Sequence, residues 1–278
     1  GVELNFGCPH GMSERGMGSA VGQVPEYVEM VTRWCKENSE LPVIVKLTPN
    51  ITDILHPARA AVAGGADAVS LINTVASVIG VDLDTMAPLP TVNGKGSHGG
   101  YCGPAVKPIA LRMIGDIARE VGPGLPISGI GGVSNWYDAA EHIAMGSGTV
   151  QVCTAAMHKG FKIVEDMIDG LSHWMDEQGY NCLEDVRGRA IPNYKNWEDL
   201  NLNYEIVARI DQDSCIQCGL CYIACEDTAH QAIIRSRDNG SRKYTVHDAE
   251  CVGCNLCMLV CPVDNCITME EVANGRSF

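Results

Sequence analysis

Eight cysteines near the end of the chain constrain its fold more than any other feature of the sequence. They form two runs of identical spacing, C-x2-C-x2-C-x3-C, and the second run starts 36 residues after the first, which indicates a duplicated unit. The runs comprise Cys215, Cys218, Cys221 and Cys225, then Cys251, Cys254, Cys257 and Cys261. Fourteen cysteines could form disulfides in a secreted protein, but the regular spacing of these eight favours metal ligands.

The spacing predicts two [4Fe–4S] clusters in a ferredoxin-like module. In the bacterial ferredoxin arrangement, the fourth cysteine of each run ligates the other cluster. One cluster is therefore expected on Cys215, Cys218, Cys221 and Cys261, and the other on Cys251, Cys254, Cys257 and Cys225. Two structural zinc sites are the alternative, but a zinc knuckle usually contributes one C-x2-C pair. Cys266 lies outside both runs and is expected to be a buried apolar thiol.

Composition narrows the class of protein. The chain has 278 residues, 46% of them hydrophobic, which is enough for one large and one small folded domain. Its formal charge is −14, and no basic patch is dense enough to follow a phosphate backbone, so nucleic-acid binding is not expected. No apolar run approaches the ~20 residues of a membrane span and no signal peptide is visible, so a cytoplasmic protein is expected.

Residues 1 to 170 alternate short apolar strands with helix-length segments. The expected strands are 1–7, 42–47, 66–73, 125–130 and 149–153, and the expected helices are 25–38, 54–64, 108–120 and 136–145. The strands are rich in Val, Ile and Leu with little polar alternation, which is typical of buried parallel strands. Polar motifs follow the strands, where a (β/α)8 barrel places its active site.

The predicted fold is therefore an α/β (β/α)8 TIM barrel followed by a small α+β ferredoxin-like domain. Five βα units can be counted where a barrel needs eight, and the chain starts inside a strand, so three upstream units are expected to be missing. The expected divisions are a partial barrel at 1–175, which the resemblance described below makes FMN-binding, a linker at 176–207 and the cluster domain at 208–278.

The motifs after the strands resemble those of a known family. NFGCPHGMSERGMG at residues 5–18 joins a strand-end amide to a cysteine and a glycine-rich loop; on pattern alone, Cys8 would more often be a buried strand-end thiol. Together with VKLTPNITDI, LINTV, GGYCGPAVKPIALR, GIGGV, QVCTA and both cysteine runs, the chain resembles dihydropyrimidine dehydrogenases. The resemblance is closest to the bacterial form, in which a separate subunit binds FAD and NAD.

The resemblance implies roles for residues of a pyrimidine site. Cys8 matches the active-site cysteine that protonates C5 of the ring while reduced flavin delivers hydride to C6. A thiol with an ordinary pKa of ~8.5 is mostly protonated at neutral pH and can act as a general acid. Asn5, Asn73 and Thr74 match residues that hydrogen-bond the pyrimidine. His10 could be a second proton donor, but a loop histidine is more often an ordinary polar residue.

A flavin site is expected beside the pyrimidine. Lys46 ends a buried apolar strand, so it needs a carboxylate or a cofactor anion as its partner. The resemblance names the N1/O2 edge of FMN, which becomes negative on reduction. The glycine-rich loops after the late strands are expected to cradle the flavin phosphate, and they contribute Gly103, Gly131, Gly132, Cys153 and Thr154.

By resemblance, the chain is an oxidoreductase subunit that reduces the 5,6 double bond of uracil and thymine in pyrimidine catabolism. Electrons would pass from NADH through the FAD of the partner subunit, the two clusters and FMN. A dihydroorotate dehydrogenase-like flavoenzyme is the second hypothesis, although orotate needs a cationic partner for its carboxylate and none is visible near Asn73. The third hypothesis is an electron-transfer ferredoxin module only.

Overall fold

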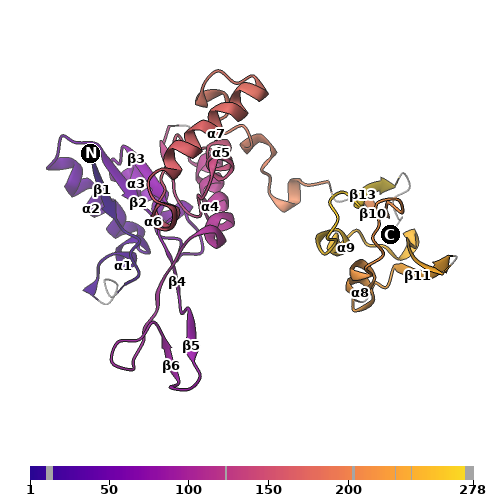
Figure 1. The fold of residues 1–278 in the computed structure, drawn as a ribbon. Coiled ribbons are helices and arrows are strands. Elements are labelled where there is room, and N and C mark those ends of the chain that lie inside the picture. Colours follow the sequence, from indigo (N-terminus) through magenta and orange to yellow (C-terminus); the bar gives the residue numbers. More distant parts are fainter. Residues whose placement is uncertain (11–14, 123, 202–203, 229, 239, 273–278) are drawn as a thin grey trace. The chain divides into compact units, whose positions relative to one another are not determined.

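The computed structural model of the protein describes residues 1–10, 15–122, 124–201, 204–228, 230–238 and 240–272. Residues 11–14 of the loop after Cys8, with Met12 and Glu14, lie outside this set. The chain divides into two compact units, Gly1–Lys195 and Asn196–Phe278 (Figure 1). Within the described ranges, no helix is long and apolar enough to cross a membrane.

A five-stranded parallel sheet organises the larger unit, in the order β1-β2-β3-β8-β9. Its strands are β1 (Val2–Asn5), β2 (Val43–Lys46), β3 (Ala68–Leu71), β8 (Ile127–Gly129) and β9 (Thr149–Val150). All five predicted strands are present, each somewhat shorter than expected. The α/β class with a parallel sheet is thereby confirmed; in the described residues the sheet is open, with β1 and β9 at its two edges.

Seven helices are described in the larger unit. They are α1 (Ser19–Gly22), α2 (Pro25–Glu37), α3 (Leu55–Ala63), α4 (Lys107–Glu120), α5 (Trp136–Ala144), α6 (Thr154–Lys159) and α7 (Ile163–Gln178), with 3-10 turns at Pro104–Val106, Leu183–Asp185 and Ile191–Asn193. The four predicted helices correspond to α2, α3, α4 and α5 within two residues at each end. Pro25 at the first position of α2 and Asn135 as the N-cap of α5 fix two of these starts.

The sheet has one apolar and one polar face. Val45, Val69 and Leu71 are fully buried and belong to the same core as Val28 of α2 and Ile114 of α4. Because side chains alternate along a strand, the residues between these apolar positions point to the opposite face. That face carries polar side chains from all five strands or their carboxyl ends, and they form the candidate site.

Residues 75–101 form an arm that extends away from the sheet (Figure 1). It contains two antiparallel pairs, β4 (Val75–Ser77) with β7 (Gly99–Tyr101) and β5 (Gly80–Asp82) with β6 (Ala87–Leu89). Ile79, Leu83 and Met86 on the arm are each more than 70% exposed. The arm was not predicted, because strands of three residues separated by Gly and Pro carry almost no periodic signal.

The structure differs from the expected linker at 176–207. Residues up to Lys195 belong to the larger unit, since α7 continues to Gln178 and the following turns pack back onto α5 and α4. The amide of Gly188 donates to the carbonyl of Ile143 (3.0 Å), and the Tyr194 hydroxyl donates to Asp116 (2.9 Å). In the sequence, this segment is only polar and mixed in composition. The structure shows that its polar groups form hydrogen bonds with the larger unit.

The smaller unit is built around its cysteines. It contains β10 (Glu205–Ile210) paired antiparallel with β13 (Ile267–Val272), the hairpin β11 (Ile233–Asp238) with β12 (Ser241–Val246), the helices α8 (Leu220–Glu226) and α9 (Leu256–Leu259), and 3-10 turns at Trp197–Asp199 and Asp248–Glu250. Among the described residues of this unit, ten are buried in its core, and four of these are cysteines: Cys221, Cys251, Cys257 and Cys266. Aliphatic side chains therefore make up only part of the core of this unit.

Candidate active site and cysteine centres

A cavity of about 230 Å³ lies at the carboxyl ends of the parallel strands. Nine predicted residues line it: Asn5, Lys46, Asn73, Thr74, Gly103, Gly131, Gly132, Cys153 and Thr154. Cys102, Ser134 and Gln151 also contribute to its wall. Sites for cofactors and small molecules are usually clefts of this kind, in which a small number of polar groups converge. The structure therefore gathers both predicted sets, for flavin and for pyrimidine, in one place.

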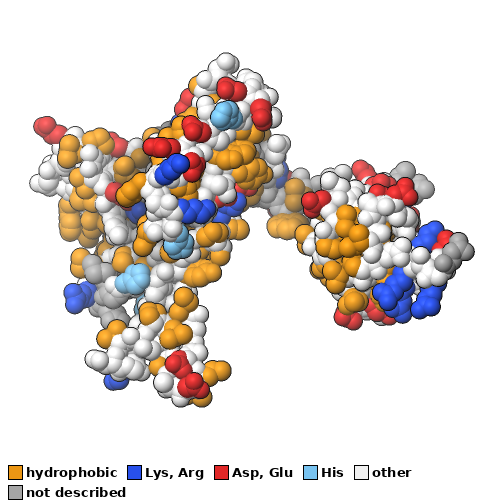
Figure 2. Space-filling view, in the orientation of Figure 1, with side chains coloured by type: hydrophobic (Ala, Val, Ile, Leu, Met, Phe, Trp, Pro, Cys, Tyr) orange, Lys and Arg blue, Asp and Glu red, His pale blue; other side chains and the backbone are white. Residues whose placement is uncertain are grey.

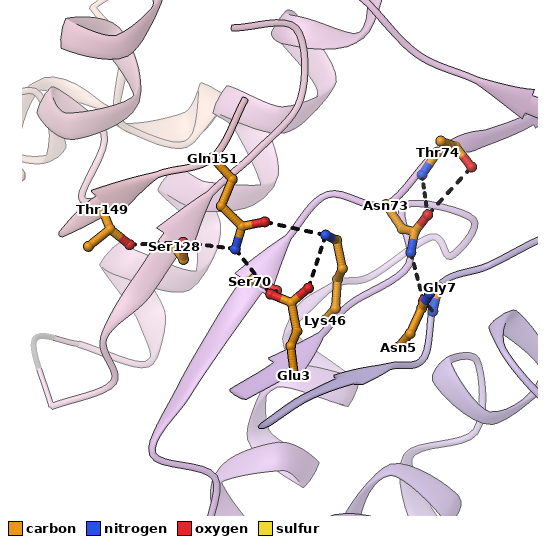
Figure 3. A network of polar contacts seen from close by, with 10 residues as sticks. All are labelled: Glu3, Asn5, Gly7, Lys46, Ser70, Asn73, Thr74, Ser128, Thr149 and Gln151. Carbon is orange, nitrogen blue, oxygen red and sulfur yellow. Dashed lines mark hydrogen bonds and ion pairs between the residues drawn. The ribbon is translucent and has the colours of Figure 1, made fainter. Parts of the chain in front are cut away.

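Lys46 is held by a network of hydrogen bonds and an ion pair on the polar face of the sheet (Figure 3). Its Nζ lies 3.1 Å from Glu3 Oε1 and 3.3 Å from Gln151 Oε1, and its side chain is only 17% exposed. The required carboxylate is thus supplied by Glu3, two residues before Asn5 on the same strand. A lysine stem that simply reaches solvent does not fit this geometry.

Glu3 is the centre of this network. Its Oε2 accepts hydrogen bonds from Ser70 Oγ (2.8 Å) and Gln151 Nε2 (3.0 Å), in addition to the ion pair with Lys46. Burial acts to raise the pKa of Glu3, but the hydrogen bonds from Gln151, Ser70 and Lys46 outweigh it and hold the pKa below its ordinary value. The carboxylate is therefore ionised at neutral pH and neutralises most of the charge of Lys46.

The two predicted asparagines contact each other (Figure 3). Asn73 Nδ2 donates to Asn5 Oδ1 (2.9 Å), while Asn73 Oδ1 accepts from the amide of Thr74 (2.8 Å). Asn50 braces the same segment by donating to the carbonyl of Thr74 (3.0 Å). In the described part of the chain, the NH2 group of Asn5 has no acceptor, so its donors are available to a carbonyl of a ligand.

Cys8 lies in the loop after β1, half-buried, and is not among the residues that line the cavity. Its Sγ is 3.7 Å from His10 Nδ1. The amide of Gly100 donates to His10 Nε2 (3.0 Å), so Nε2 is unprotonated and the neutral ring carries its proton on Nδ1, facing the sulfur. His98 Nε2 lies 3.0 Å from the carbonyl of Pro9. The base of the arm thereby fixes the loop that carries the thiol.

The glycine-rich turn after β8 brings backbone close to the cavity. Gly131 and Gly132 have φ of +131° and +77°, and a Cβ at Gly132 would lie 2.7 Å from the backbone nitrogen of Lys107. A Cβ at Gly131 would lie 2.8 Å from side chains of Ala110 and Ile72. Both positions therefore exclude a side chain, and the peptide groups of the turn form the cavity wall.

Each predicted set of four cysteines surrounds its own cavity in the smaller unit. Cys215, Cys218, Cys221 and Cys261 line one small cavity, and Cys225, Cys251, Cys254 and Cys257 line a second. The fourth cysteine of each run lies with the first three of the other run, as the crossed arrangement requires. Among the described residues, no three His, Cys, Asp or Glu side chains converge closely enough to bind a single metal ion.

The cysteine centres are apolar. Burial raises the pKa of Cys221 and of Cys257 to about 11, so their thiols are protonated when they bind no metal. Cluster ligands are thiolates, so assembly must release protons. Cys266 is 2% exposed and lines the first cavity beside Cys261, with its Sγ donating to the carbonyl of Asp211 (3.6 Å). It is buried as expected, but closer to the centre than its place in the sequence suggested.

Comparison with known proteins assigns the larger unit. The family profile described as Dihydroorotate dehydrogenase matches residues 1–175. The chain belongs to the dihydroorotate dehydrogenase family. A second profile, described as 4Fe-4S dicluster domain, matches residues 208–269, which contain both cysteine runs. The order of motifs predicted a flavin barrel followed by a two-cluster module, as in dihydropyrimidine dehydrogenases, and the two profiles match the chain in that order.

The relatives of this dihydroorotate dehydrogenase family member confirm the resemblance to dihydropyrimidine dehydrogenases. The chain is 47% identical over 274 residues to NAD-dependent dihydropyrimidine dehydrogenase subunit PreA of Escherichia coli (strain K12), covering 98% of this chain and 65% of that protein. It is 42% identical over 203 residues to the chloroplastic Dihydropyrimidine dehydrogenase (NADP(+)) of Arabidopsis thaliana, covering 72% and 48%. It is 40% identical over 189 residues to the catalytic subunit of Dihydroorotate dehydrogenase B (NAD(+)) of Pyrococcus abyssi, covering 68% and 60%.

The chain thus spans between 48% and 65% of the length of these relatives. Within the part that belongs to the dihydroorotate dehydrogenase family, the sequence analysis missed Glu3, Gln151, Asn50 and the arm residues that contact the Cys8 loop. A signal for Glu3 was present, since it alternates with Asn5 on one strand and must share its face. Gln151 and Asn50 lie in the motifs QVCTA and VKLTPNITDI, but their partners are distant in the sequence, so no local pattern indicated these contacts.

Proposed function

We propose that the chain is the flavin- and cluster-binding subunit of an oxidoreductase that reduces the 5,6 double bond of uracil and thymine, with a role in pyrimidine catabolism. The observation that supports this most is the single cavity lined by nine residues whose flavin and pyrimidine roles were predicted independently of the structure. The 47% identity to a dihydropyrimidine dehydrogenase subunit supports the same substrate class. We further propose that the parallel sheet is part of a (β/α)8 barrel in the complete protein.

The residues of the cavity fit FMN. Lys46 would contact the N1/O2 edge of the flavin. The peptide groups of Gly131 and Gly132 would face the phosphate, together with Gly103, Cys153 and Thr154. All of these residues line the cavity. When bound, the flavin supplies the hydride that C6 of the pyrimidine accepts. The amides of Asn5 and Asn73, with the hydroxyl of Thr74, would bind the alternating carbonyl and N–H groups of the pyrimidine and fix its orientation.

The proton for C5 would come from the thiol of Cys8. His10 is placed to assist this proton transfer. Its Nδ1–H faces Sγ and can donate a hydrogen bond to the thiolate that remains after the proton has left. The thiol must then reach the ring, and the loop that carries it is anchored by His98 and Gly100 at the base of the arm.

The two cysteine centres would each hold one [4Fe–4S] cluster and pass electrons one at a time. Their source would be a partner subunit that binds FAD and oxidises NADH; the relative in Escherichia coli is itself named a subunit. An NAD-dependent dihydropyrimidine dehydrogenase of this kind joins hydride chemistry in the larger unit to electron transfer in the smaller one.

Anaerobic reduction of the full-length protein tests this function. After iron and FMN have been quantified, the protein is reduced chemically and mixed with uracil or thymine. We expect prompt reoxidation of the flavin and formation of dihydrouracil or dihydrothymine. A protein with full iron and flavin that does not respond to either pyrimidine would contradict the proposed substrate class.

Orotate is the informative second substrate. The carboxylate of orotate requires a cation, and the only cation among the described residues that line the cavity, Lys46, is already paired with Glu3. We therefore expect orotate to reoxidise the flavin far more slowly than uracil. A preference for orotate would instead favour the dihydroorotate dehydrogenase hypothesis.

Replacing Glu3 with Gln is expected to raise the reduction potential of the bound flavin. The glutamine can still accept the hydrogen bond that Ser70 donates, but it lacks the negative charge that pairs with Lys46. The cation therefore stabilises the negative charge of the reduced flavin more strongly. With an effective dielectric constant of ~20, the shift is on the order of 20–60 mV. Spectroelectrochemical titration measures it, and Glu177→Gln on the exposed part of α7 is the control; equal potentials in both variants would refute the role of Glu3.

A further inference from the structure

The positive charge of the smaller unit is concentrated on one hairpin. Residues 196–278 contain six Lys and Arg and thirteen Asp and Glu, and four of the six cations lie on β11 and β12: Arg235, Arg237, Arg242 and Lys243. All four are exposed. Figure 2 shows this group of Lys and Arg side chains on the smaller unit. The hairpin is therefore a basic surface on an otherwise strongly acidic unit.

These cations do not stabilise the unit through ion pairs. The ion pairs found among its described residues all involve Arg209, which contacts Asp248 and Glu270. On the hairpin, Arg237 lies directly opposite Arg242 in the antiparallel register. Like charges at directly opposed positions destabilise a strand pair. Protection of strand edges from aggregation would explain charge on the hairpin, but mixed charges would serve that purpose equally well.

The basic hairpin lies against the first cysteine centre. The backbone amide of Arg242 donates to Gln217 Oε1 (3.1 Å), and Gln217 stands between Cys215 and Cys218 in the first run. Tyr244 of β12 is 2% exposed and lines the same cavity as Cys215 and Cys261. The guanidinium carbon of Arg235 lies 5.0 Å from the ring centre of Tyr222 on α8, the helix that carries Cys221.

We propose that the hairpin β11–β12 is the docking site for an acidic surface of the protein that delivers electrons to the centre of Cys215, Cys218, Cys221 and Cys261. The inference rests on the proposed function, because it requires a cluster in that centre. Charge complementarity indicates that the partner is acidic. An acidic surface relieves the repulsion between Arg237 and Arg242. The positive hairpin also attracts such a surface, although the net charge of the chain is −14. Docking there brings the donor beside the cavity wall formed by Tyr244.

Reduced flavodoxin, an acidic flavoprotein, is a suitable probe for this surface. One electron leaves the reduced flavodoxin and enters the oxidised cluster. Stopped-flow absorbance of the full-length protein gives the second-order rate constant of cluster reduction. We expect this constant to fall about tenfold as NaCl is raised from about 20 to about 300 mM, because salt screens exposed charges.

Arg237→Gln with Arg242→Gln is expected to lower the rate constant at low salt about five- to tenfold and to flatten its salt dependence. Arg237→Lys with Arg242→Lys keeps both charges and should restore the native values, which separates charge from damage to the hairpin. Lys159→Gln with Lys162→Gln removes the same charge from exposed positions of the larger unit and should change little. Iron content is compared in all variants.

The outcomes are distinct. Equal rate constants and equal salt dependence in the native protein and the double glutamine variant would overturn the docking site. A change in self-association without a change in cluster reduction would also overturn it, since the hairpin would then face another copy of the chain. A protein that binds no iron would overturn both this inference and the proposed function, whereas failure to reduce uracil would affect only the latter.

Discussion

Replacing Cys8 with Ala is expected to lower the rate of dihydropyrimidine formation by roughly 10²- to 10⁴-fold, the range typical for loss of a general acid. The thiol is the proposed proton donor, and His10 Nδ1 at 3.7 Å is placed to stabilise the sulfur after the proton leaves. Because Cys8 does not line the cavity, iron content, flavin content and flavin reduction by chemical reductants should be unchanged. Steady-state turnover with uracil measures the loss.

Cys35→Ala is the matched control for Cys8→Ala. Cys35 is also half-buried, but it lies on α2, which covers the apolar face of the sheet. Its removal should leave turnover within about twofold of the native rate, a change of about 0.4 kcal/mol in the barrier. Full activity of Cys8→Ala would remove the thiol from the chemistry and leave His10 as the nearest alternative donor.

Replacing Cys261 with Ala is expected to remove one cluster, about four of about eight iron atoms, and to stop electron delivery to the larger unit. The lost cluster should be the one on the first cysteine run, because Cys261 lines the cavity of Cys215, Cys218 and Cys221 although it belongs to the second run. Iron analysis gives the stoichiometry. Electron paramagnetic resonance of the reduced protein should show one isolated cluster where the native protein shows two interacting ones.

Cys266→Ala tests whether Cys266 or Cys261 is the fourth ligand of this centre. Cys266 lines the same cavity and is almost fully buried, so geometry alone leaves it within reach of the cluster. The spacing of the runs assigns the ligand role to Cys261, and Cys266→Ala should retain full iron. Loss of iron from Cys266→Ala, with retention in Cys261→Ala, would reverse the assignment.

The sequence was most informative where local chemistry decides the structure. The runs VIV before Lys46 and AVSL at Ala68–Leu71 can form only buried strands in this context, and both lie at the predicted positions. The spacing within each cysteine run is a local property of the chain, and the bacterial ferredoxin arrangement supplied the crossed grouping, which agrees with the cysteines that share each cavity. Asn5 and Asn73, 68 residues apart, were placed together only through the family resemblance, and the structure joins them by a hydrogen bond.

Long-range polar contacts could not be predicted from the sequence. Glu3 contacts Gln151 across 148 residues, and nothing in the neighbourhood of either residue indicates the other. The arm gave no signal, because its strands pair over three residues each and expose apolar side chains that normally indicate a core. The polar turns between Gln178 and Lys195 resembled a linker because their bonds go to backbone groups of α5 rather than to a recognisable motif.

The cysteine-rich core of the smaller unit affects how the stability of this unit depends on exposure to oxygen. Four of its ten buried core residues are thiols, so the groups that would hold the clusters also fill the interior. Metal binding to such a site contributes directly to folding free energy. Destruction of a cluster by oxygen is therefore expected to destabilise the core that also contains Tyr244, Val207 and Ile267. We therefore expect oxidative damage to lower the free energy of unfolding of this unit, whereas the described buried core of the larger unit contains no cysteine.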